Sequence, residues 1–221
     1  MTWREDAGSE ERIMIPPASE PTTMDSALAL IRAEHEALAK VLHGLDVVTH
    51  DVSEYGAKPD FDLLATMLYY IDQFPERCHH PKEEAFLFAR VRERTRDADT
   101  ILEALQSEHR RGERLIADLA LKLVRYQGGG QAELAPFAAA VAGYLEFSWN
   151  HMRTEEDLLL PIAQRVLSPA DWDAIDAAFR TNDDPMFGRA PSPQYTRLYT
   201  RIVNLAPRKL WPSLRLKGER Q

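Results

Sequence analysis

Apolar residues recur along four long stretches of the chain at alternating steps of three and four positions. The first stretch begins near Asp25 or Ser26, either of which can cap a helix. Its apolar positions are Leu28, Ile31, Leu38, Leu42 and Leu45. This spacing forms one stripe along an α-helix and is typical of the buried face of a helix in a bundle. His35 takes the one place in the stripe that no apolar residue fills.

The second and third stretches show the same spacing, and helix-breaking residues set their limits. Asp60 can cap the second stretch. Within it, Pro75 and Pro81 each remove a backbone donor, so that we expect this helix to bend or unwind. The third stretch spans about residues 97–126 and is followed by three glycines at 128–130, which we expect to form a loop.

Polar residues also occupy core places in the third and fourth stretches. In the third stretch this residue is His109. The fourth stretch begins near residue 132 and has His151 and Glu155 at two consecutive core places. A short fifth helix is predicted to follow Ser168, because an N-cap residue and then a proline at the first helical position are a common helix start.

The pattern therefore predicts an all-α protein, an up-down-up-down four-helix bundle with a short extra C-terminal helix and extended tails. We expect a flexible N-terminal tail over residues 1–24. The bundle and its fifth helix are expected over residues 25–181, and a basic C-terminal extension over residues 182–221.

The composition suits one globular domain, because 44% of the 221 residues are hydrophobic. No uninterrupted apolar run approaches about 18 residues, so that no membrane span is expected. The N-terminal sequence lacks the basic and apolar regions of a signal peptide, and we therefore expect a cytoplasmic protein. Cys78 is the single cysteine, which excludes an internal disulfide and a cysteine-rich zinc site. We expect Cys78 to be buried and inert.

The net charge of −8 hides an asymmetry along the chain. Residues 189–221 hold eight of the 27 Lys and Arg residues and one of the 35 Asp and Glu residues, so that residues 1–188 hold 19 basic and 34 acidic residues. A basic tail of this kind is able to touch nucleic acid or anionic lipid. We expect instead that it lies on its own acidic body or extends into solvent.

One motif occurs twice. His79 and His151 are each followed four positions later by a glutamate, Glu83 and Glu155 respectively, then by a second glutamate and an apolar run. Residues four apart lie on one face of an α-helix, with Cβ atoms about 6 Å apart. Each pair therefore offers an imidazole and a carboxylate to one point in space, as the ligands of a metal ion do.

Together, the motifs and the polar core places suggest a metal site. Burying such groups without partners costs on the order of several kcal/mol, whereas four histidines and two glutamates are able to hold two metal ions. Nitrogen and oxygen donors without thiolate suit iron, manganese or zinc. Six protein ligands for two octahedral ions leave positions open for dioxygen, nitric oxide, peroxide or water. The expected ligands are His35, His79, Glu83, His109, His151 and Glu155.

One histidine in each of the first and third helices, with His-x-x-x-Glu-Glu and an apolar segment in the second and fourth, resembles the hemerythrin-like cation-binding (HHE) family. The resemblance covers about residues 26–167. It implies a non-haem di-iron centre that is bridged by two carboxylates and an oxo or hydroxo group, and it implies the same six ligands. Zinc or manganese are alternatives to iron for these donors.

The family often has a fifth histidine on the first or second helix, and His80, His43 and His50 are the candidates here. His80 has its own carboxylate four residues later, Glu84, so that the second motif has two registers. We prefer His79 with Glu83, because aligning the two Glu-Glu pairs also superposes the apolar segments that follow them. His80 is then either a fifth ligand or a residue that contacts one.

Three kinds of function remain open. The first, which we favour, is a protein that binds or senses a small ligand such as oxygen, nitric oxide or peroxide, or that stores iron. The second is a di-iron oxidoreductase acting on peroxide or oxygen, or a protein that delivers iron for repair. The third is a structural metal bundle whose basic tail contacts nucleic acid or a protein partner.

Overall fold

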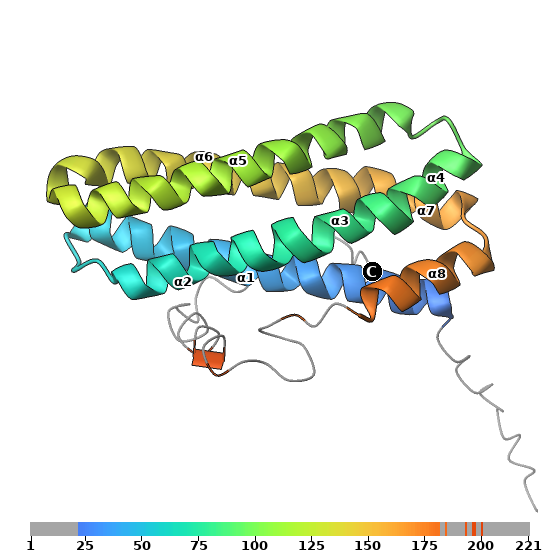
Figure 1. Ribbon diagram of the computed structural model, residues 1–221, viewed down its shortest axis with the longest axis horizontal. Coiled ribbons are helices and arrows are strands. Elements are labelled where there is room, and N and C mark those ends of the chain that lie inside the picture. Colours follow the sequence, from blue (N-terminus) through green and yellow to red (C-terminus); the bar gives the residue numbers. More distant parts are fainter. Residues whose placement is uncertain (1–21, 182–183, 185–192, 194–195, 198–199, 201–221) are drawn as a thin grey trace, which may run out of the picture.

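Four long helical segments run side by side, and consecutive segments are antiparallel (Figure 1). The computed structural model describes residues 22–181 and, beyond them, residues 184, 193, 196, 197 and 200. The predicted tail up to residue 21 and nearly all of the predicted extension 182–221 lie outside the described residues. No strand occurs among the residues that are described. The prediction of an all-α bundle is confirmed.

The first segment, α1 (Thr23–Tyr55), begins slightly before its predicted start. Thr22 is the N-cap, not Asp25 or Ser26. Asp25 has a different role, because its side chain accepts a hydrogen bond from the Thr22 backbone while the Thr22 hydroxyl accepts one from the Asp25 backbone. At the other end, Gly56 adopts the left-handed conformation, with φ 63°, that closes a helix.

The second segment stays helical past both prolines but unwinds locally, which is one of the two outcomes expected. Wider π-helical turns absorb the lost donors, and the His80 N–H bonds to the Pro75 carbonyl five residues back. Asp60 caps the segment as predicted. Its consecutive parts are α2 (Phe61–Ile71), η1 (Asp72–His79), α3 (His80–Lys82), η2 (Glu83–Phe88) and α4 (Ala89–Arg94).

The third and fourth segments meet in a much tighter turn than the predicted glycine loop. Gly128 and Gly129 are still part of α5 (Asp99–Gly129), and a single 3₁₀ turn, η3 (Gly130–Glu133), leads into the next helix. Of the three glycines at 128–130, Gly130 alone has a positive φ, of 68°. The fourth segment consists of α6 (Leu134–Thr154), the π-helical turn η4 (Glu155–Leu159) and α7 (Leu160–Val166).

The predicted fifth helix is α8 (Pro169–Phe179), capped by Ser168 as expected. It lies against α1 and reaches η2 of the second segment (Figure 1). None of the helices in the described part of the chain is long and apolar enough to cross a membrane.

A layer of histidines and glutamates separates two apolar clusters inside the bundle. Along α1, Ile31 belongs to one cluster and Leu38 to the other, and His35 lies between them in the sequence. Along α5, His109 likewise lies between Leu105 of the first cluster and residues of the second. The polar layer is therefore shielded from solvent on both sides along the bundle axis.

Candidate metal centre

Each of the four segments brings at least one histidine into the polar layer. His35 comes from α1, His109 from α5 and His151 from α6, while His79 and His80 are neighbours on the second segment. All five imidazoles are buried. Consecutive residues of a regular α-helix point in directions about 100° apart. His79 and His80 nevertheless both face inward, and the junction of η1 with α3 lies between them.

The donor atoms form two groups, within each of which all donors lie within 4.8 Å of one another. We call them the two-histidine group and the three-histidine group. The two-histidine group consists of His35, His79, Glu83 and Glu155. The three-histidine group consists of His80, His109 and His151. All six residues expected from the sequence come together in this layer, and His80 joins them.

The two glutamates face both groups. The Oε2 atom of Glu155 lies 3.3 Å from the His35 Nε2, while its Oε1 atom lies 3.5 Å from the His151 Nε2. The Oε1 atom of Glu83 lies 3.3 Å from the His79 Nε2, and its Oε2 atom lies 3.6 Å from the Nε2 of His109. Each carboxylate therefore presents one oxygen to each group, as a carboxylate that bridges two cations does.

These oxygens have no hydrogen-bond donor. Glu83 and Glu155 are each 1% exposed, and all four of their carboxylate oxygens are buried without a hydrogen-bond partner. The same is true of the Nε2 atoms of His109 and His151. Buried polar atoms of a folded protein are nearly always satisfied, and a buried carboxylate without a counter-charge is costly. Cations between the two groups would satisfy these atoms, so that the donor set fits a pair of metal ions.

The outer nitrogen of every imidazole contacts a further glutamate. Metal-binding histidines commonly donate their other N–H to a carboxylate, which orients the ring and makes the inward nitrogen a better donor. The Nδ1-to-carboxylate distances are His35 to Glu156 2.9 Å, His79 to Glu34 2.7 Å, His80 to Glu76 3.1 Å, His109 to Glu84 2.8 Å and His151 to Glu108 2.9 Å.

Four of these five glutamates are next to an inward-facing residue in the sequence, a pattern that was not used to predict them. Glu34 and Glu108 directly precede an inward histidine, and Glu84 and Glu156 directly follow an inward glutamate. In each case the partner histidine lies on another helical segment. Glu84, considered as a ligand in the alternative register, is in neither donor group and accepts a hydrogen bond from the Nδ1–H of His109.

The inward carboxylates raise the pKa of three of the imidazoles. Burial alone would lower the pKa of His35, but its contacts with the carboxylates of Glu155 and Glu156 raise that pKa to about 9. The same balance of burial against the contacts with Glu155 and Glu83 raises the pKa of His109 to about 9. The pKa of His79 lies well above its ordinary value, because Glu83 again outweighs burial.

His80 behaves in the opposite way. Its burial and the neighbouring charges of His109 and His151 hold its pKa well below the ordinary value. The His80 and His109 rings are stacked, with centroids 4.2 Å apart. Burial acts to raise the pKa of Glu155, but the surrounding imidazoles outweigh it and hold this pKa well below its usual range.

The other histidines and the cysteine lie away from both groups. His43 is half-buried, and the exposed His50 contacts the Tyr55 ring edge-on. Of the three candidates for a fifth histidine, only His80 joins a donor group. Cys78 is exposed, so that the prediction of a buried cysteine is wrong. Cys78 directly precedes His79 and His80. Because these two side chains face inward, the Cys78 side chain lies on the outside of the helix.

Glu76 is the most deeply buried of the five outer glutamates, at 3% exposed. Its carboxylate accepts hydrogen bonds from the His80 Nδ1 and from the Tyr144 hydroxyl, which lies 3.3 Å away. Burial raises the pKa of Glu76 to about 7, although the Tyr144 hydrogen bond opposes the rise. The carboxylate lies directly against Gly112 of α5, where a Cβ would be 2.8 Å from the Glu76 Oε1.

Gly112→Ala is therefore expected to displace Glu76 and with it His80. The carboxylate is held from two sides, so that overpacking at this position should cost about 1–3 kcal/mol of unfolding free energy. Metal binding by the three-histidine group should also weaken. Gly143→Ala is the control, because nothing lies within 4 Å of its Cβ position. Thermal unfolding and metal titration of both variants measure the effect, and equal behaviour of the two would contradict this role of Gly112.

The fold and the site together define a class of protein, a helical bundle with a buried histidine and carboxylate site suited to metal cations. Residues 26–163 match the family model of the hemerythrin HHE cation binding domain. The chain belongs to this family. The family resemblance inferred from the sequence is confirmed, and no curated protein matches the chain.

Proposed function

We propose that the chain holds two metal ions, one in each donor group, and that Glu83 and Glu155 bridge them. The observation that carries this proposal is the orientation of the four buried carboxylate oxygens, which lack hydrogen-bond donors and face both groups. Without cations between the groups, the bundle would bury these atoms at a large cost in free energy.

Iron is the metal that we propose, as the family and the donor types suggest. Imidazole and carboxylate donors without thiolate also suit manganese and zinc, and the exposed Cys78 belongs to neither group. A bound iron pair would supply two adjacent redox-active ions. The five outer glutamates orient the imidazoles so that the other ring nitrogen faces the donors of its group, and the two apolar clusters keep water away.

The proposed role is to bind or sense a small ligand such as oxygen, nitric oxide or peroxide. The two-histidine group offers two nitrogens and one oxygen from each bridging carboxylate, while the three-histidine group offers one nitrogen more. An octahedral ion takes six donors, so that both ions would keep open positions, and the ion of the two-histidine group would keep more of them. A purely structural site would gain nothing from such positions.

Elemental analysis of protein from iron-replete, chelator-free culture tests the metal site. Two ions per chain are expected, and His109→Ala should lose the ion of the three-histidine group because it removes a central donor of that group. His50→Ala is the matched control, since His50 is exposed and lies outside both groups. Wild-type protein without transition metal, or His109→Ala with an unchanged metal content, would refute the assignment.

The visible spectrum separates ligand binding from catalysis. The iron-loaded protein is reduced without oxygen and then exposed to oxygen, nitric oxide or peroxide. A charge-transfer band that appears with the ligand and vanishes on its removal supports binding or sensing. Steady consumption of peroxide or oxygen with excess reductant would instead support the oxidoreductase alternative.

A further inference from the structure

Helix α8 lies beyond the residues that match the family model, which end at residue 163. It nevertheless packs along α1 and against η2, the two elements that carry His35 and Glu83 (Figure 1). Its inner face, formed by Trp172, Ile175 and Phe179, is part of one of the two apolar clusters that border the polar layer.

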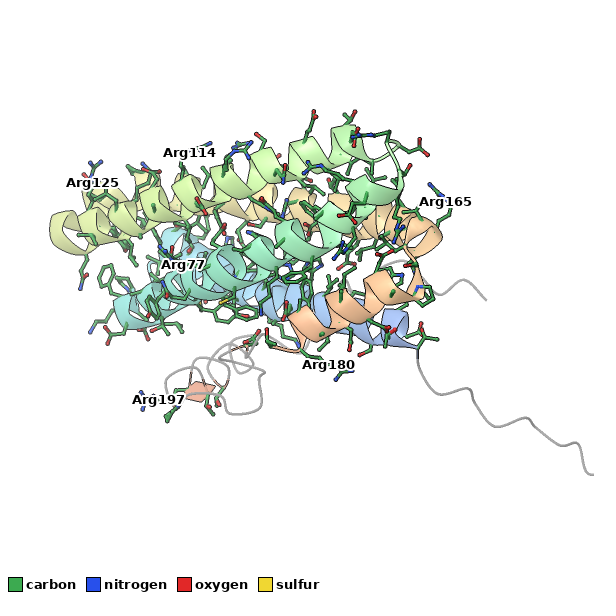
Figure 2. All side chains as sticks on the ribbon, turned by 45° about the vertical axis from the view of Figure 1, so that its right-hand side comes forward. Arg77, Arg114, Arg125, Arg165, Arg180 and Arg197 are labelled. Carbon is green, nitrogen blue, oxygen red and sulfur yellow. The ribbon has the colours of Figure 1, made fainter. Side chains whose placement is uncertain are left out.

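Polar contacts hold α8 in place at both ends. At its start, Arg94 of α4 forms two hydrogen bonds to Asp171, at 2.8 and 3.0 Å. At its end, Arg180 bonds Asp176 and also donates to the Ser26 hydroxyl of α1 at 2.6 Å, and Figure 2 labels Arg180 beside this helix. The α8 position is thus defined by contacts to the first and second segments.

The chain that follows α8 is tied to the second segment next to the site. Lys82, the residue before Glu83, donates to the Thr181 hydroxyl at 2.7 Å. Further on, the buried Asp184 accepts a hydrogen bond from Tyr70 of α2 at 3.0 Å. These contacts tie the chain after α8 to the second segment, the first of them next to Glu83 in the sequence.

Phe179 of α8 contacts a histidine of the two-histidine group. Its ring is fully buried and meets the His79 ring edge-on, with centroids 5.9 Å apart and planes at 80°. The Nδ1 atom of His79 contacts the Glu34 carboxylate. Phe179 thus packs beside an imidazole of the two-histidine group.

We propose that α8 is the outer wall of the two-histidine group and that Phe179 determines which ligands reach it. The inference rests on the metal site proposed above. An apolar wall admits small neutral molecules such as oxygen, nitric oxide or hydrogen peroxide at little cost. A charged ligand must give up its hydration to cross the wall, which is far more costly. Bulky anions, chelators included, are therefore held out.

The test measures the loss of metal from cobalt(II)-loaded protein to excess EDTA, followed by the visible spectrum of bound cobalt. The series Phe179→Leu, Phe179→Val and Phe179→Ala shortens the side chain stepwise, so that the smaller changes serve if the largest one fails to fold. Loss of one of the two cobalt ions should speed up as the side chain shrinks. For Phe179→Ala we expect about tenfold, or about 1.4 kcal/mol in the barrier.

Ile175→Ala is the control. Ile175 is also fully buried, belongs to the same cluster and lies one turn earlier on α8. Phe179 keeps its full ring in this variant, so the rate of cobalt loss should stay within about twofold of wild type, under 0.5 kcal/mol in the barrier. Three results would refute the proposed role of Phe179. These are equally fast cobalt loss in Ile175→Ala, faster loss of both cobalt ions alike, and a rate of loss that does not rise along the Phe179 series. A wild-type chain that binds no cobalt would instead overturn the proposed metal site.

Discussion

Glu155→Gln is expected to abolish tight binding of both metal ions. Glutamine has nearly the same shape but carries no charge, and its amide nitrogen must replace one of the two oxygens. Whichever end the nitrogen takes, it faces imidazole nitrogens of one group, because the Glu155 oxygens lie 3.3 Å from His35 and 3.5 Å from His151. Since both ions would share this carboxylate, the loss should affect both.

Isothermal titration of the metal-free variant with cobalt(II) or iron(II) measures this effect, and circular dichroism verifies that the variant is folded. Glu156→Gln is the matched control, because Glu156 is the next residue, contacts the outer nitrogen of His35 and belongs to neither donor group. It should weaken the two-histidine group by about 10–100-fold, the usual effect of losing such a partner, and spare the other ion. Two ions bound by Glu155→Gln at wild-type affinity would refute the bridging role.

Metal affinity is expected to rise steeply with pH up to about pH 9. In the metal-free chain the pKa values of His35 and His109 are both raised to about 9. At pH 7 both rings are therefore protonated, and each must release its proton before it can bind a metal. Because His35 and His109 belong to different groups, the logarithm of the affinity for each ion should gain at least about one unit per pH unit below pH 9, and that of the three-histidine group should level off above it.

The stability of the metal-free chain should change in the opposite direction. A histidine whose pKa is higher in the folded than in the unfolded state contributes stability that is complete below its unfolded pKa, about 6.5. This contribution is lost as the pH rises through the folded value, about 9 for both rings. Urea unfolding between pH 6 and pH 10 should thus show falling stability without metal. A metal affinity independent of pH over this range would contradict the prediction.

Much of the site could be predicted from the pattern of the chain. His35, His109 and His151 interrupt stripes of apolar residues, and a buried polar residue at such a place needs a partner. The repeated His-x-x-x-Glu spacing predicted that Glu83 and Glu155 would join them, since residues four apart share a helix face. The structure brings all six residues into one layer.

His80 and the outer glutamates depended on the three-dimensional arrangement. A regular helix cannot turn two consecutive side chains equally inward, so that helical periodicity left His80 undecided between two roles. The π-helical turn before it allows both His79 and His80 to face the layer. The partners of four outer glutamates lie on other segments, and one-dimensional spacing carries no information about contacts between helices.

The sequence by itself determined the four segments, the fifth helix and the histidines and glutamates of the buried layer, because helical periodicity and burial cost act locally. Only the tertiary structure decided how these residues divide into two groups, which oxygens face both, and that Phe179 lies against His79. The physical reason is that bridging and shielding depend on distances between atoms of different helices. These distances are set by how the helices pack, and α8 adds its own packing contacts from outside the four-helix bundle.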